Sequence, residues 1–217
     1  ATGVGTKENP YLIKTAEDLV VFADRINHPD EDDNAKYLDA YFRLTADIDM
    51  TGRDWTPAGQ VVTVNEGEEG EVTYHGFSGT FDGAGHKITN LKVTKLLRSS
   101  VYYLGLFGVT EHAEIRDLTL ENIDYSVESG GNNDAIGVGI GGVVGRAGLT
   151  NLYNVRVTGT IAASLCEKNK AFIGGLVGEY SVSSSEQAYI AYVEGCSADI
   201  QILSRNFDDG EKSAMET

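Results

Sequence analysis

The sequence is poor in proline, cysteine and positive charge. Its 217 residues include three prolines and two cysteines, and 33 Asp and Glu against 17 Lys and Arg give a formal net charge of −16. Such an acidic excess argues against binding to nucleic acid, which needs a basic stripe, and against binding to an anionic membrane surface. It is typical of a soluble protein with a solvated acidic exterior.

Long apolar runs are also missing, so the sequence predicts no membrane span, and no stretch has the pattern of a secretory signal peptide. The sequence begins at Ala1 without Met, and we expect the export signal to lie outside it. Two alternatives stay open for the cysteines. Cys196 is a buried thiol that acts as a small hydrophobe, or it forms a disulfide with Cys166. The number of cysteines does not settle the compartment.

Glycine is abundant instead, with 26 of the 217 residues against a usual share of roughly 7%. Together with the shortage of proline, this predicts many turns inside a regular structure rather than a flexible linker. Three glycine pairs each enclose two apolar residues, at Gly105–Gly108, Gly142–Gly145 and Gly175–Gly178. Glycine permits tight bends where no side chain fits. We therefore expect each pair to bracket a short strand at a corner.

A second motif follows each glycine pair: an apolar residue, two mostly polar residues, then two apolar residues separated by one. It occurs at Ile115–Leu120, Leu152–Val157 and Val193–Ala198, and earlier at Ile88–Val93. The alternation predicts a short strand with one buried face. One such unit is too small to bury its apolar face alone, whereas stacked units bury a continuous core. The repeats therefore predict an all-β solenoid.

In a solenoid, equivalent side chains of successive coils stack on one another. We expect one inward column of aliphatic side chains and Cys196, and a second column that begins with phenylalanine. The first contains Leu91, Leu118, Val155 and Cys196. The second contains Phe81, Phe107, Val144 and Val177.

The N-terminal part has a helical pattern. Thr15 is a good N-cap, acidic residues follow it, and the apolar spacing after it predicts a helix from Ala16 to Asn27. An amphipathic helix laid over the first coil would hide the open end of the solenoid. We expect a single β-helix domain at 1–203, with an N-terminal cap at 1–36, coils at 37–203 and a polar tail at 204–217.

Several segments are expected to leave the regular coils. Two valine-rich strands around a Gly- and Glu-rich turn predict a protruding β-hairpin insertion near 61–74. Corner loops are expected at Lys95 to Tyr103, at Ser126 to Val138, and in the Ser-rich run from Ser181 to Ala188. Binding residues tend to sit on loops that a rigid scaffold presents. The hairpin and the second corner loop are therefore the first places to look for a ligand.

No residue is assigned a catalytic, cofactor-binding or metal-binding role. Asp47, Asp49 and Asp54 resemble an acid cluster for sugar cleavage, but alternation beside Ile48 and Met50 favours solvation and turn chemistry. His86 has no partner that spacing fixes, which favours a corner histidine in a hydrogen bond over a catalytic base. The acidic loop at 30–33 lacks the Gly turn and the spaced ligands of a calcium loop.

The motifs together resemble the GLUG repeat of bacterial secreted and cell-surface proteins. The resemblance runs from about residue 5 to 203 and includes Asn9–Ile13, Leu44–Met50 and Phe77–His86 beside the glycine pairs. Val143 in the second copy and Gly195 in the third depart mildly from the pattern. The resemblance implies a right-handed parallel β-helix and an extracellular setting, as in surface proteins of gut Bacteroidetes. It implies no reaction.

Three functions are compatible with the sequence. The leading hypothesis is a non-catalytic extracellular module, which binds a host protein or a glycan or serves as a rigid spacer in a larger surface protein. The first alternative is a polysaccharide-active β-helix enzyme, a lyase or a hydrolase. The second is a non-catalytic region of a secreted metallopeptidase, because the resemblance includes the N-terminal regions of immunoglobulin A-specific metallopeptidases. The His-Glu-x-x-His motif of their protease domain is absent here.

Overall fold

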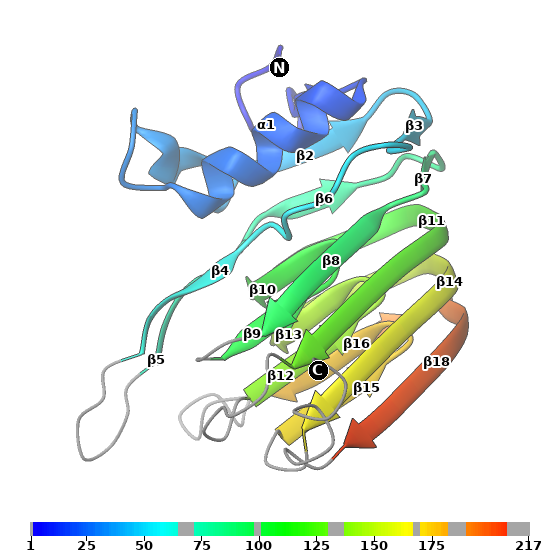
Figure 1. Cartoon of the computed structure of the whole chain (residues 1–217). Coiled ribbons are helices and arrows are strands. Elements are labelled where there is room, and N and C mark those ends of the chain that lie inside the picture. The colour runs from blue at the N-terminus through cyan, green and yellow to red at the C-terminus, as the bar shows by residue number, and fades with distance from the viewer. Residues whose placement is uncertain are drawn as a thin grey trace.

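The computed structural model describes residues 2–64, 72–97, 101–129, 137–166, 170–181 and 190–207. These residues form a parallel β-solenoid of about three turns with a helix at its N-terminal end (Figure 1). All pairings among the described strands are parallel, except that of β4 with β5. The predicted solenoid is therefore present, and its handedness stays a prediction.

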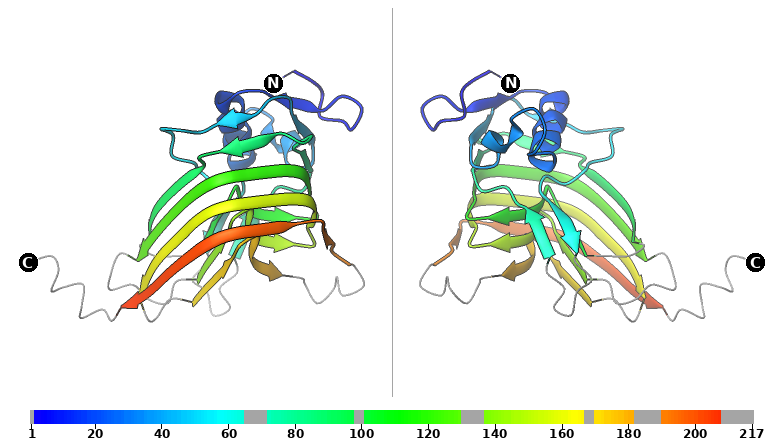
Figure 2. Two further views of the ribbon diagram at one scale, coloured as in Figure 1. Left: turned by 90° about the vertical axis from the view of Figure 1, so that its right-hand side faces the viewer. Right: turned by 90° about the vertical axis from the view of Figure 1, so that its left-hand side faces the viewer.

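The largest sheet follows the long axis of the solenoid and contains ten strands. Its central path is β1 (Tyr11–Ile13), β2 (Tyr41–Leu44), β6 (Thr80–Asp82), β11 (Glu114–Ser129), β14 (Asn151–Cys166) and β17 (Val193–Glu194). Alongside lie β3 (Ile48–Asp49), β7 (Lys87–Thr89), β8 (Lys92–Leu97) and β18 (Ser197–Phe207). Figure 2 shows β8, β11, β14 and β18 as long, curved rungs stacked along one side.

Two three-stranded sheets form the rest of each coil. One contains β9 (Tyr102–Leu104), β12 (Gly137–Gly141) and β15 (Lys170–Gly174). The other contains β10 (Phe107–Glu111), β13 (Val144–Gly148) and β16 (Val177–Ser181). A complete coil therefore passes through three sheets in turn, for example β12, β13 and β14.

The stacked columns are confirmed in part. Phe107 pairs with Val144, and Val144 pairs with Val177, so these three side chains stack as predicted. Leu118 pairs with Val155 in the same way. Arg156 pairs with Ser197, which places Cys196 beside Val155 as predicted. The assignments of Phe81 and Leu91 were wrong. Phe81 pairs with Phe42 and Ile115 in the large sheet. Leu91 lies directly before β8, and the first residue of β8, Lys92, pairs with Asp124 of β11. Leu91 is therefore beyond the corner at Asn122 and does not stack on Leu118.

Asparagine and aspartate at left-handed corners explain the misplaced column. Asn90 and Asn122 both have φ of +58°, and the side-chain amide of Asn122 donates to Asn90 Oδ1 at 2.7 Å. A second corner uses the same conformation at Asp117, Asn154 and Gly195, with φ of +50°, +53° and +65°. Asn and Gly adopt such φ values at little cost. The motif therefore occurs at two corners of a coil, and Ile88 stacks on Leu120 rather than Ile115.

Gly195, the mild departure from the repeat, keeps the geometry of its corner. Its φ of +65° matches that of Asn154 in the preceding coil. A side chain at this position would meet Asn154 Oδ1. Glycine therefore replaces asparagine here with the same backbone turn.

The helix α1 (Ala16–Asn27) has the predicted bounds and N-cap. The Thr15 hydroxyl accepts from the Asp18 N–H at 3.2 Å, and Asp18 Oδ2 accepts from the Thr15 N–H at 3.0 Å, so the two residues form a capping box. The apolar face of α1, with Leu19, Phe22, Ala23 and Ile26, is buried. Figure 1 shows α1 lying across the end of the solenoid.

Other boundaries differ from the predictions. A 3₁₀ turn at Asn34–Tyr37 precedes β2. Strand β8 runs to Leu97, β11 runs to Ser129, and β18 runs to Phe207, so the predicted loops and tail begin too early. The reason is the neighbouring coil, because backbone pairing with β14 continues as far as Cys166 and Phe207 and holds polar residues in the strand.

The hairpin region contains an antiparallel pair, β4 (Gln60–Val64) with β5 (Val72–His75). The turn at 65–71 lies outside the described residues, as do 98–100, 130–136 and 182–189. That this pair is a protruding insertion stays a prediction. Within the described ranges, no helix has the length and apolar character needed to cross a membrane.

Cys196 is a free thiol, so the Cys166–Cys196 disulfide is not formed. The prediction of full burial was wrong, since Cys196 is half-buried against the core. It lies on the last described coil, where the strands pair on one side only. Its Sγ accepts from the Val155 N–H at 3.4 Å.

Candidate functional site

Three shallow hollows adjoin one another beside the base of the β4–β5 pair. Their volumes are about 290, 210 and 320 Å³, and Gln60 lines all three. The first adjoins β8 and β9, the second adjoins α1, and the third adjoins the loop after α1. We call this continuous surface the hairpin-base groove. Its floor is the segment 54–61.

The floor of the groove is fixed by hydrogen bonds from other parts of the fold. The Asn27 side chain donates to Pro57 O at 3.0 Å and accepts from the Gly59 N–H at 2.8 Å. Trp55 is buried, and its indole N–H donates to Leu106 O at 3.0 Å. The segment is thus tied to α1 on one side and to the glycine-bracketed turn on the other. A ligand would meet a preformed surface.

The side chains around the first hollow combine aromatic and charged groups. Tyr102, Tyr103, Lys95 and Asp54 line it. The ammonium group of Lys95 lies 5.2 Å from the centroid of the Tyr102 ring, within the range of a cation–π contact. Aromatic faces with polar groups at their edges suit ligands that have both apolar and hydroxyl-bearing surfaces.

The far end of the groove carries histidine and carboxylate groups. His28 Nδ1 lies 3.2 Å from Asp24 Oδ1, and His75 and Glu31 line the third hollow. The groove therefore combines one lysine, one aspartate and two tyrosines at one end with histidine and carboxylate groups at the other. Of the predicted ligand-binding places, the hairpin base adjoins this groove, and the middle of the 126–138 loop lies outside the described residues.

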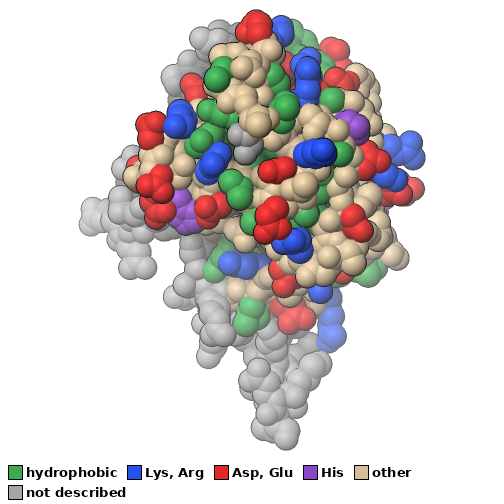
Figure 3. All heavy atoms as spheres, turned by 90° about the horizontal axis from the view of Figure 1, so that it is seen from above, with side chains coloured by type: hydrophobic (Ala, Val, Ile, Leu, Met, Phe, Trp, Pro, Cys, Tyr) green, Lys and Arg blue, Asp and Glu red, His purple; other side chains and the backbone are tan. Residues whose placement is uncertain are grey.

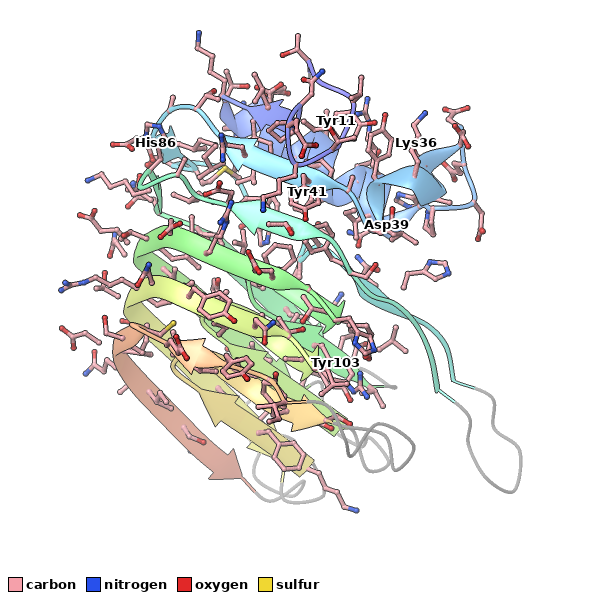
Figure 4. All side chains as sticks on the ribbon, turned by 180° about the vertical axis from the view of Figure 1, so that it is seen from behind. Tyr11, Lys36, Asp39, Tyr41, His86 and Tyr103 are labelled. Atoms are coloured by element: carbon pink, nitrogen blue, oxygen red, sulfur yellow. The ribbon has the colours of Figure 1, made fainter. Side chains whose placement is uncertain are left out.

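His86 has a partner that spacing did not reveal. Its Nδ1 lies 3.1 Å from Asp47 Oδ1, and Asp47 also accepts from the Lys87 N–H at 3.2 Å. The backbone hydrogen bond from Lys87, followed by the His86 side chain, lowers the pKa of Asp47. Figure 4 shows His86 at the corner of the large sheet, well apart from Tyr103, which lines the first hollow. The pair holds a corner, as the prediction of a hydrogen-bonded histidine required.

The Asp49 carboxylate also accepts hydrogen bonds within a turn. Its Oδ1 accepts from the Asn90 amide at 2.8 Å and from the Thr51 hydroxyl at 2.7 Å. These hydrogen bonds, with that of Asn90 first, lower its pKa to about 2. A general acid needs a raised pKa, so Asp49 does not suit that role. Asp54 lies apart on the groove floor, and the three aspartates serve separate places.

The acidic loop at 30–33 forms one local ion pair, between Lys36 Nζ and Asp33 Oδ2 at 3.0 Å. Asp32 and Asp33 have φ of +45° and +60°, so the chain turns at these residues. Among the described residues, no group of three or more His, Cys, Asp or Glu side chains is placed to hold a metal ion.

An ionic cluster around a buried carboxylate joins three strands of the large sheet. Asp82 on β6 accepts from Arg43 Nη2 at 2.8 Å and from Arg116 Nη2 at 3.0 Å. The Asp82 side chain is 8% exposed, whereas those of Arg43 and Arg116 are 44% and 28% exposed. Burial raises the pKa of Asp82. The hydrogen bonds from Arg43 and from the Ala84 N–H, together with the two positive charges, lower the pKa by more than burial raises it, so the net pKa is lowered.

This cluster leads to a prediction on stability. We expect Asp82→Asn to lower the free energy of unfolding at pH 7 by about 2 kcal/mol, less than for a fully buried pair because both arginines reach solvent. Since the folded pKa is lowered, the stabilisation is present above the unfolded pKa of 3.8 and is lost as the pH falls through the folded value. Urea unfolding at pH 7 and pH 3 measures both effects.

Asp124→Asn is the matched control, because Asp124 is exposed on β11 of the same sheet. It should leave the midpoint of unfolding nearly unchanged at both pH values. A difference between Asp82→Asn and the unmodified protein that stays constant from pH 7 to pH 3 would refute the role of the ionised carboxylate.

No protein-family model matches the chain, so membership of the GLUG family stays a prediction. The chain is 32% identical over 188 residues to halomucin of Haloquadratum walsbyi, which covers 84% of this chain and 2% of halomucin. It is 34% identical over 137 residues to a protein of Evansella cellulosilytica provisionally described as a Gly-rich membrane protein, which covers 59% of this chain and 13% of that protein. The chain thus spans a small part of each relative.

Among solved structures, the chain is similar to a crystal structure from Bacteroides ovatus, provisionally described as an immunoglobulin A1 protease. The match covers 98% of this chain and 88% of that chain, with 16% identity and a TM-score of 0.37. Similarity at this level supports no argument about the function of this chain.

Proposed function

We propose that this chain is a non-catalytic recognition module of an extracellular or surface protein, and that the hairpin-base groove binds its ligand. The observation that carries the proposal is the contrast between two sets of polar groups. Of the candidate catalytic residues, Asp47, Asp49 and His86 are held in corner hydrogen bonds. Asp54 instead lines the preformed groove, together with Gln60, Lys95 and Tyr102.

A solenoid suits this role mechanically. Each coil is hydrogen-bonded to its neighbours, so the groove floor and the strands beside it keep their relative positions. A rigid support lowers the entropy lost when a ligand binds. The same rigidity would suit a spacer. If the groove binds no ligand, the result favours the spacer over the recognition module.

The extracellular setting rests on three supports. The net charge of −16 suits a solvated exterior, and one relative is provisionally described as a membrane protein. The resemblance to the GLUG repeat points the same way. Labelling of intact cells with an impermeant amine reagent, followed by digestion and detection of peptides of this chain, tests the setting directly.

The ligand class we propose is a glycan or a host protein that presents hydroxyl and amide groups beside an apolar face. Such a ligand would stack on the tyrosines of the first hollow and bond to Gln60 and Lys95.

A binding array of glycans and host proteins, probed with the purified chain, tests the proposal. We expect the double variant Gln60→Ala, Lys95→Glu to weaken binding to any ligand found by at least about tenfold. Lys7→Glu is the matched control, since it makes the same charge change at an exposed residue that does not line the groove.

Equal loss in the double variant and in Lys7→Glu would show that general charge, not the groove, governs binding. The same glycans should be assayed for new reducing ends and for unsaturated products. Release of either product would contradict the recognition module and support the polysaccharide-active enzyme.

A further inference from the structure

The last described coil keeps the apolar pattern of an internal coil. Ile202 is 43% exposed, whereas its register partner Ile161 is fully buried. Val193 is 51% exposed, whereas its partner Leu152 is fully buried. Terminal repeats of solenoids usually carry a polar outer face. Here the inward side chains of the last coil are uncovered.

The backbone of the same coil also has open edges. Among the described strands, β15 pairs only with β12, β16 only with β13, and β18 only with β14. Unpaired edge strands are templates for pairing with another chain. β18 is the longest of these edges, with 11 residues from Ser197 to Phe207. Proline on an edge strand hinders such pairing, and β18 contains no proline.

The opposite end of the solenoid is closed. Leu19, Phe22 and Ile26 of α1 are buried against the first coil. The outer surface of that end carries Lys, Arg, Asp and Glu side chains of both signs, interspersed with other residues (Figure 3). The core at this end is therefore covered, whereas the core at the end with β18 is not.

The sequence of β18 is complementary to itself in the antiparallel direction. Asp199 and Arg205 lie three positions before and after Ile202, and all three are exposed. Asp199 and Arg205 pair with Thr158 and Ser164 of β14. Both lie an odd number of residues from Ile202, whose partner Ile161 is buried, so alternation places them on the outer face of the sheet. An antiparallel pair of β18 strands centred on Ile202 would place Asp199 of each copy opposite Arg205 of the other.

We propose that two copies of this chain associate tail to tail through β18, antiparallel and in the register centred on Ile202. Opposite charges directly across an antiparallel pair stabilise it, and like charges destabilise it. Each ion pair would occur twice because of the two-fold symmetry, and the contact closes because both copies use the same edge. The uncovered apolar ends of the two cores then face each other instead of water.

Analytical ultracentrifugation of the full chain over a range of concentrations tests the proposal. We expect a monomer–dimer equilibrium. Asp199→Arg and Arg205→Asp should each raise the dimer dissociation constant by about tenfold, because each puts like charges opposite one another twice. The double variant should return it to within about threefold of the original value, since the pairs are restored with reversed sign.

Asp124→Arg is the matched control, because it makes the same charge change on β11, away from the edge. It should leave the dissociation constant unchanged, and circular dichroism should show the same fold in all variants. A chain that stays monomeric at the highest concentration measured overturns the proposal. Dimers that weaken equally in the single and double variants overturn the register.

Discussion

Gly145→Ala should destabilise the protein by at least about 3 kcal/mol, measured as the free energy of urea unfolding. A methyl group at Gly145 on β13 would overlap the backbone nitrogen of Leu104 and lie 2.7 Å from the carbonyl carbon of Tyr103. Both atoms belong to β9 in the neighbouring sheet, so no flexible side chain can move away. Two strands that touch backbone to backbone must separate, and the whole coil would shift with them.

The next coil provides an independent repeat of this test. A methyl group at Gly178 on β16 would lie 2.5 Å from the backbone nitrogen of Ile140 on β12. Gly137→Ala is the control, because the nearest atom to its added methyl group is Val101 Cγ1 at 3.5 Å, an ordinary contact. It should change stability by less than about 1 kcal/mol. Equal losses at Gly137 and Gly145 would contradict close strand packing as the cause.

The glycine pairs show what the sequence could predict of the fold. Their spacing correctly indicated a bend that repeats in successive coils, and the stacking of Phe107, Val144 and Val177 followed from that spacing. The pairs do not bracket strands as predicted, because β10, β13 and β16 begin at the third residue of each pair and continue past the second glycine. The physical reason goes further than a tight turn. The second glycine of each pair also lets two sheets touch through their backbones, which is a contact between strands that no single segment reveals.

The misaligned column shows where pattern reasoning failed. The motif of Ile88–Val93 recurs as Leu120-Glu-Asn122-Ile123-Asp-Tyr125, and this second occurrence within the 16-residue strand β11 gives the true register. Ile115–Leu120 matches the same pattern at a different corner. Because asparagine or aspartate with positive φ serves both corners, the residue types alone do not say which corner a motif occupies.

The candidate groove was only partly predictable. The antiparallel pair β4–β5 was expected from its valine-rich segments, and this pair adjoins the groove. The groove itself is formed where α1, the segment 54–61 and β9 meet, and these are distant in sequence. The two bonds of Asn27 that fix its floor arise from tertiary packing at the end of the helix. Such contacts leave no periodic signal.

The second large effect is expected at the N-terminal end, where α1 covers the core. Phe22 is 2% exposed, and its ring centroid lies 4.6 Å from that of Phe42, 5.3 Å from that of Phe81 and 5.7 Å from that of Phe77. One side chain of the helix therefore contacts aromatic rings from several strands. We expect Phe22→Ala to lower the free energy of unfolding by about 3–5 kcal/mol.

The loss of stability in Phe22→Ala should appear first at the N-terminal end of the solenoid. In a solenoid each coil contacts only its neighbours, so a damaged cap opens the first coil while the later coils persist. Hydrogen exchange should therefore accelerate most in β2 and β6 beneath α1, and least in β14. Val21→Ala is the control, since Val21 lies on the same helix and is 39% exposed, and it should change little. Uniform acceleration along the chain would show instead that the helix and all coils unfold as one cooperative unit, in which the cap protects no particular end.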